Sequence, residues 1–129
     1  MTALDTNVLA RYILADDPAQ EARAVAVVEG GPCLVPVTVL LELAWVLGKP
    51  AGGDRALIVR QLRTVLGLPT VYVADPEAVW TAFGDAEAGM DLADAFHRAF
   101  AAGADRLATF DRRFADAATG RAGVRVEMI

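Results

Sequence analysis

The sequence predicts an α/β protein, a three-layer α/β/α sandwich around a central, mainly parallel sheet. Short β-like segments alternate along the chain with longer segments of helical pattern. Right-handed crossovers between parallel strands follow from this alternation. The chain has 129 residues, of which 55% are apolar and 22% charged, which suits one well-buried core. We therefore expect a single domain over residues 1–129.

The first half of the chain begins with a strand over residues 2–4, followed at once by a helix over residues 6–15. Two aspartates and a proline end that helix, and the proline opens the next one, which runs to Glu29 before a pair of glycines. A second strand is expected over residues 33–35. The apolar segment 37–47 then reads as a buried helix, which a glycine, a lysine and a proline bring to an end.

The second half repeats the alternation, with proline or aspartate at the helix starts. In order, we expect a helix capped by Asp54, a strand over 70–73, a helix from Pro76, a helix from Asp91 or Leu92 to about Gly103, a strand over 106–109, a helix over 111–117 and a closing strand over 123–127. No internal repeat or linker interrupts this order, so the same sandwich accounts for the whole chain.

Composition and charge narrow the possible functions. The formal net charge is −5, which argues against broad electrostatic binding to nucleic acid but not against an enzyme whose carboxylates hold cations. No apolar run is long enough to span a bilayer and no secretory signal opens the chain, so we expect a cytoplasmic protein without a membrane partner. Cys33 is the only cysteine and is expected to be buried.

Glu42 stands out because of its surroundings. Between residues 34 and 47 the only polar side chains are Thr38 and Glu42, so the helix is expected to be buried nearly all round. A carboxylate inside such a helix costs several kcal/mol unless it is paired, protonated or bound to a cation. Two interpretations stay open: a structural ion pair with an arginine such as Arg11 or Arg60, or a functional site.

Three further acids occupy positions suited to a site. Asp5 and Asp111 each follow a predicted strand at its carboxyl end, where ligands bind in open α/β sheets. Asp94 lies in the first turn of its helix, three residues after Asp91. Each of these aspartates taken alone is also explained as a helix cap or as an acid favoured by the helix dipole.

Taken together, the acids favour a metal site. Carboxylates gathered without a counter-ion repel one another, whereas Mg²⁺ or Mn²⁺ prefers carboxylate oxygens and water as ligands. The chain has a single histidine, His97, and a single cysteine, which makes a zinc site improbable. Carboxylate-held cations suit phosphodiester hydrolysis. The alternative of a different class is a non-catalytic α/β signalling module of the receiver type. A receiver needs a lysine near its acids, and Lys49, in a loop beside Pro50, is poorly placed for that role.

Four short segments, in order and at suitable spacing, resemble the motifs of PIN domains. They are Leu4-Asp5-Thr6-Asn7, Leu41-Glu42-Leu43, Asp91-Leu92-Ala93-Asp94-Ala95 and Thr109-Phe110-Asp111-Arg112-Arg113-Phe114. The length and the final strand suit a stand-alone domain of the VapC toxin type. The short, glycine-rich connection after Leu47 departs from the family pattern and puts the local helix lengths in question.

The resemblance implies a Mg²⁺- or Mn²⁺-dependent endoribonuclease that is the toxin of a type II toxin–antitoxin pair. Its expected partners are RNA, a cognate antitoxin and a second copy of the chain in a homodimer. A PIN nuclease with a duty in RNA processing is the alternative within enzymes. The residues that the resemblance assigns are the metal-binding and catalytic acids Asp5, Glu42, Asp94 and Asp111, the auxiliary acid Asp91, and the supporting residues Asn7 and Thr109.

The remaining candidates are side chains near these motifs. Arg112 and Arg113 suit contacts with RNA phosphates, although charges at a helix start are commonly just solvated. His97 is expected to be packed against the protein. The large aromatic residues are expected to form core, or in part a dimer or partner face, rather than a base-stacking platform. They are Trp45, Trp80, Phe83, Phe96 and Phe100.

Overall fold

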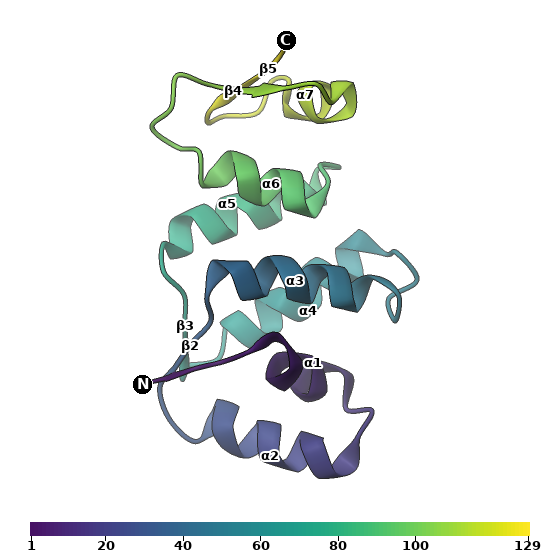
Figure 1. Cartoon of the computed structure of the whole chain (residues 1–129), viewed down its shortest axis with the longest axis vertical. Coiled ribbons are helices and arrows are strands. Elements are labelled where there is room, and N and C mark those ends of the chain that lie inside the picture. The colour runs from purple at the N-terminus through teal and green to yellow at the C-terminus, as the bar shows by residue number, and fades with distance from the viewer. The chain divides into compact units, whose positions relative to one another are not determined.

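The computed structural model describes residues 1–129 (Figure 1). Its contacts divide the chain into two compact units, Met1–Ala74 and Asp75–Ile129, which are described separately below. None of the helices combines the length and the apolar character that crossing a bilayer requires. The expectation of a single domain over residues 1–129 stays a prediction.

The first unit contains a three-stranded parallel sheet with β2 in the middle. The strands are short, and Thr2 of β1 and Val71 of β3 both lie opposite Cys33 of β2. Helices α1 and α2 connect β1 to β2, and α3 and α4 connect β2 to β3. The bounds are β1 (Thr2–Ala3), α1 (Thr6–Leu14), α2 (Pro18–Glu29), β2 (Cys33–Leu34), α3 (Val37–Gly48), α4 (Arg55–Leu66) and β3 (Val71–Tyr72).

The helix starts of the first unit follow from local chemistry. Asp17 caps α2 by accepting a hydrogen bond from the Gln20 N–H, with a proline at the first helical position. Asp54 caps α4 in the same way, accepting from the Leu57 N–H. The core of this unit consists of fully buried aliphatic side chains from the helices and from β2, including Leu9, Val28, Cys33, Val35, Leu43, Val59 and Leu62. The expected burial of the only cysteine is thereby confirmed.

The second unit contains three helices and a two-stranded parallel sheet. The bounds are α5 (Pro76–Glu87), α6 (Leu92–Ala99), β4 (Arg106–Thr109), α7 (Arg112–Ala118) and β5 (Arg125–Met128). Helix α7 connects β4 to β5, and Arg106 lies opposite Arg125 in the parallel register. Helices α5 and α6 pack against each other through the buried rings of Phe83 and Phe96, whose centroids are 5.9 Å apart in an edge-to-face arrangement.

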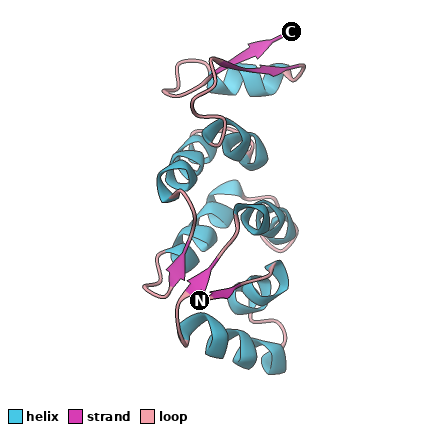
Figure 2. Ribbon diagram, turned by 60° about the vertical axis from the view of Figure 1, so that its left-hand side comes forward, coloured by secondary structure: helices cyan, strands magenta, loops and turns pink.

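The predicted α/β class with parallel strands is confirmed, and every predicted helix and strand is present (Figure 2). Two boundaries differ by more than one residue. Helix α6 ends at Ala99 instead of near Gly103, because the N–H groups of Ala101 and Ala102 bond three residues back in tighter turns. Strand β5 begins at Arg125 instead of position 123, because the preceding carbonyls accept bonds from a buried arginine rather than from a strand.

Candidate functional site

Three of the predicted acids lie at the starts of two helices in the second unit. Asp91 is the N-cap of α6, and its Oδ1 accepts from the N–H groups of Ala93 (3.0 Å) and Asp94 (3.2 Å). Asp111 is the N-cap of α7, and its Oδ1 accepts from Arg113 (2.9 Å) and Phe114 (3.3 Å). In both residues the hydrogen bonds fall on one carboxylate oxygen. The other carboxylate oxygen accepts no hydrogen bond.

Asp94 is the member of this group whose protonation is perturbed. Burial raises the pKa of Asp94 above its ordinary value, and the negative charges of Asp91 and Asp111 raise it further, while His97 acts in the opposite direction. The Asp94 carboxylate has no hydrogen-bond or ion-pair partner of its own. The structure therefore places Asp91 and Asp111 within electrostatic reach of Asp94.

Asp5 in the first unit differs from the other aspartates at helix starts. It occupies the N-cap position of α1, but its side chain makes no capping hydrogen bond. The neighbouring Thr6 is buried, and its Oγ1 also lacks a hydrogen-bond partner. The simple capping explanation for Asp5 is thus removed, and both carboxylate oxygens stay available.

Glu42 lies on α3 of the same unit, but the expectation that it is buried is wrong. Helix α3 buries only the stripe Leu40, Leu43 and Leu47, and Glu42 is exposed on another face. It forms no ion pair with an arginine, and Arg11 pairs with Asp16 instead. An apolar sequence all round a helix does not specify which face its own unit covers, which explains the error.

The supporting residues show one contact. The Oγ1 of Thr109 accepts the N–H of Asp111 at 2.9 Å, which fixes the backbone at the end of β4. Asn7 is exposed and forms no side-chain hydrogen bond. Arg112 and Arg113 are both exposed. The expectation that His97 is packed is wrong, since its side chain is exposed at the helix surface.

The aromatic residues divide between core and surface. Phe83 and Phe96 are buried, as expected. Trp45 is 83% exposed, and Trp80 and Phe100 are also exposed. The core expectation holds for two of the five, and the other three leave ring surface open.

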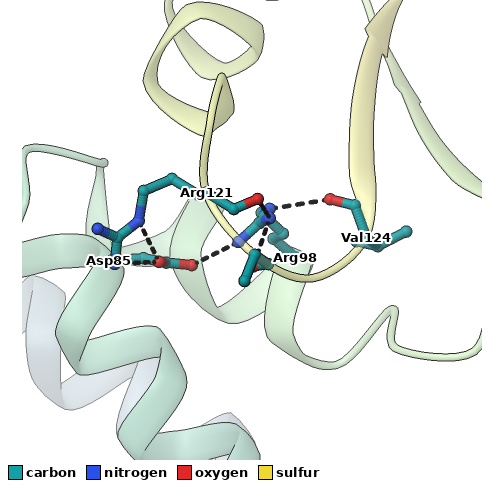
Figure 3. Close-up of polar contacts among 5 residues, drawn as sticks. Asp85, Arg98, Arg121 and Val124 are labelled. Carbon is teal, nitrogen blue, oxygen red and sulfur yellow. Dashed lines mark hydrogen bonds and ion pairs between the residues drawn. The ribbon is translucent and has the colours of Figure 1, made fainter.

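A buried ion-pair network that sequence reasoning missed fixes the helices bearing the acids (Figure 3). Arg98, one turn after Asp94 on α6, is 2% exposed and its Nη1 donates to Asp85 Oδ2 of α5 at 2.8 Å. Its other donors bond three carbonyls of the segment between α7 and β5, those of Arg121, Ala122 and Val124. Arg121 in turn pairs with Asp85 Oδ1 at 2.8 Å. The signal in the sequence was the position of Arg98, three residues after Ala95 on the apolar stripe of α6.

Comparison with known protein families gives one match. The family model of the PIN domain matches residues 2–120, nearly the whole chain. The chain belongs to the PIN domain family. Its fold is therefore the PIN domain fold, an α/β sandwich, as the sequence predicted. A comparison with curated proteins finds no significant match.

PIN domain membership bears on the chemistry at a coarse level. The PIN domain is generally a nuclease fold and its members typically use divalent metal ions, which favours the nuclease interpretation over a receiver-like signalling module. Within neither unit do three or more histidine, cysteine, aspartate or glutamate side chains surround one point closely enough to hold an ion. The donor chemistry nevertheless fits a hard cation. The available groups are carboxylates, and a positive charge offsets both the burial and the repulsion from Asp91 and Asp111 that raise the pKa of Asp94.

Proposed function

We propose that this PIN domain is a metal-dependent endoribonuclease and the toxin of a VapBC-type pair. The observation that carries the proposal is the acidic group of the second unit, in which a half-buried, unpartnered Asp94 faces the charges of Asp91 and Asp111. A fold that gathers like charges without pairing them loses stability unless a cation binds there. Family membership supplies the reaction class, hydrolysis by a nuclease.

The proposed ligand set is Asp5, Glu42, Asp94 and Asp111, with Asp91 as an auxiliary and Mg²⁺ or Mn²⁺ as the ion. When bound, the ion supplies an activated water and stabilises the charge that develops on the phosphate. The chain's own part is to hold the carboxylates: the caps of α6 and α7 orient Asp91 and Asp111, and Thr109 fixes the backbone at Asp111.

The biological setting forms part of the same proposal. The substrate is RNA, the protein acts in the cytoplasm as a homodimer, and a cognate antitoxin blocks it by laying an apolar helix in a groove and directing a basic side chain at the acids. A small gene for such an antitoxin beside this one supports the toxin role. Its absence, together with cleavage of a defined precursor RNA, supports a processing enzyme instead.

The decisive experiment is cleavage of RNA by the purified chain. Activity is expected with Mg²⁺ or Mn²⁺, is abolished by a chelator, and is lost in Asp5→Asn and Asp94→Asn. Glu77→Gln serves as the matched control, since Glu77 is an exposed acid at the start of α5 that belongs to no predicted motif. Full activity of either aspartate variant contradicts the site assignment, and metal-independent cleavage contradicts the metal.

A further inference from the structure

Phe110 is an aromatic side chain that the fold leaves in water. It lies between Thr109 of β4 and Asp111, and it is 81% exposed. Phe114, four residues later, is only 5% exposed, so this segment buries one phenylalanine and presents the other. A single exposed apolar residue needs no explanation by itself. The fixed backbone that carries Phe110 and the arginines near it indicate a binding role.

The backbone that carries Phe110 is held on both sides. Before it, β4 is paired with β5 up to Thr109, which lies opposite Met128. After it, the N–H of Asp111 donates to Thr109 Oγ1, and the Asp111 carboxylate caps α7 through Arg113. The ring is therefore presented from a fixed backbone and has only its own two torsions to restrict. A group held in this way loses little entropy when it binds.

Two arginines close to Phe110 in the sequence have no ion-pair partner. The second unit has six arginines, and four of them, Arg98, Arg106, Arg121 and Arg125, form ion pairs with carboxylates. Arg112 and Arg113, which follow the acid next to Phe110, are exposed and have no carboxylate partner. Guanidinium groups in that state are free to bind phosphate in the bidentate way that arginine favours. An exposed ring and two uncommitted arginines thus flank one proposed metal-binding acid.

We propose that Phe110 stacks on an unpaired RNA base beside the scissile phosphate, while Arg112 and Arg113 contact neighbouring phosphates. This inference rests on the proposed function and adds a side chain of this chain that contacts an unpaired base of the RNA. Aromatic stacking combined with basic contacts is how proteins bind single strands, whose bases expose their faces. A duplex covers those faces. Because the net charge of −5 disfavours binding by phosphate contacts alone, base stacking carries a large share of the affinity.

The test compares Phe110→Leu and Phe110→Trp with a matched control, Tyr72→Leu, which removes another exposed ring from the end of a strand. Binding of a short single-stranded RNA and of its duplex is measured by fluorescence anisotropy, with Asp5→Asn added to every protein to prevent cleavage. Loss of one stacked base weakens binding by about 5- to 150-fold. We expect that loss for Phe110→Leu with the single strand only, near-normal binding for Phe110→Trp, and no change for Tyr72→Leu.

Several results overturn the inference. Equal single-strand binding by Phe110→Leu and its parent shows that no base stacks there. A lowered melting temperature or a change from dimer to monomer in Phe110→Leu shows that the ring packs against protein, because substitutions of solvated side chains scarcely alter stability. Cleavage assays with proteins that keep Asp5 show whether only the stacking role fails or the proposed function fails as well. If the unaltered chain cleaves RNA and Phe110→Leu cleaves it equally, with unchanged KM, only the stacking role is refuted. If the unaltered chain neither binds nor cleaves RNA, the proposed function is refuted too.

Discussion

Replacing Arg98 by methionine tests whether the buried network holds the second unit together. Arg98 is 2% exposed and Asp85 3% exposed, with 2.8 Å between the paired atoms. Methionine keeps most of the apolar volume but removes the charge and all four hydrogen bonds. Breaking a buried pair by removing one partner costs about 3–5 kcal/mol.

The structure favours the cost of breaking one buried pair over the larger sum for four separate hydrogen bonds. Four charged hydrogen bonds at about 1.5–3 kcal/mol each sum to more than twice as much. The residues whose carbonyls would lose Arg98 lie in a largely exposed segment, so water replaces part of what they lose. Asp85 also keeps Arg121, which is 40% exposed on its side chain. We therefore predict a loss of about 3–5 kcal/mol, a large share of the roughly 5–15 kcal/mol that stabilises a typical domain.

Urea unfolding measures this loss through the transition midpoint. With a slope of about 1–3 kcal/mol/M, the midpoint of Arg98→Met falls by about 1 M or more. Arg121→Gln is the control, because it removes a pair that is open to solvent on one side and costs about 1 kcal/mol or less. The double variant Arg98→Met/Asp85→Leu should lose less than the sum of the two single variants, since replacing both charges leaves no buried charge unpaired. A loss below about 1 kcal/mol for Arg98→Met, or strict additivity in the double variant, refutes the reasoning.

Three further predictions concern the acids. Asp94→Asn should raise the melting temperature of the metal-free protein at neutral pH. Folding raises the pKa of Asp94, so the protonated side chain stabilises the folded state at a pH below the unfolded pKa. This stabilisation is lost as the pH rises through the raised pKa of the folded state. Melting curves with chelator across this range check the prediction, and a constant difference between the two proteins contradicts it. Asp5→Asn should leave the free energy of unfolding unchanged, since no cap bond is lost, but it should reduce RNA cleavage more than about 100-fold. Asp111→Ala should reduce cleavage and also lower the free energy of unfolding by about 1 kcal/mol, measured with urea, because it removes a helix cap. Thr109→Val should weaken Mn²⁺ binding about 10- to 100-fold by titration calorimetry, and unchanged affinity would mean that the bond to the Asp111 N–H does not orient the acid.

Local chemistry made most of the fold predictable from the sequence. Proline and aspartate at the helix starts set the beginnings of α2 and α5 to the residue. The end of α6 was mispredicted because the last turn tightens. The start of β5 was mispredicted because Arg98, remote in sequence, binds the carbonyl that precedes the strand. Period and propensity carry no information about such partners.

The assignment of the site residues stays a prediction, and the structure tests only the surroundings of each residue. The four motifs fixed which acids to examine, and the second unit does bring Asp91, Asp94 and Asp111 into electrostatic contact. The burial of Glu42 was mispredicted because a helix that is apolar all round does not indicate which face its own unit covers. Arg98 and Asp85 were missed because a buried charge pair joins two positions that no short motif contains.

The sequence posed cap and ligand as competing explanations for each aspartate, and the structure removes the competition. In Asp91 and Asp111 the hydrogen bonds from the helix fall on Oδ1 alone, so the same residue can start a helix and offer a second oxygen. In the proposed metal site the cap has a second use, because it fixes the direction of the carboxylate. Asp94 has no such bond, and burial raises its pKa. Two of the three acids in the proposed metal site are therefore oriented by their own helices, and the third has no partner. The electrostatic cost of holding that site empty is concentrated on Asp94, whose substitution should therefore separate metal-free stability from metal-dependent activity.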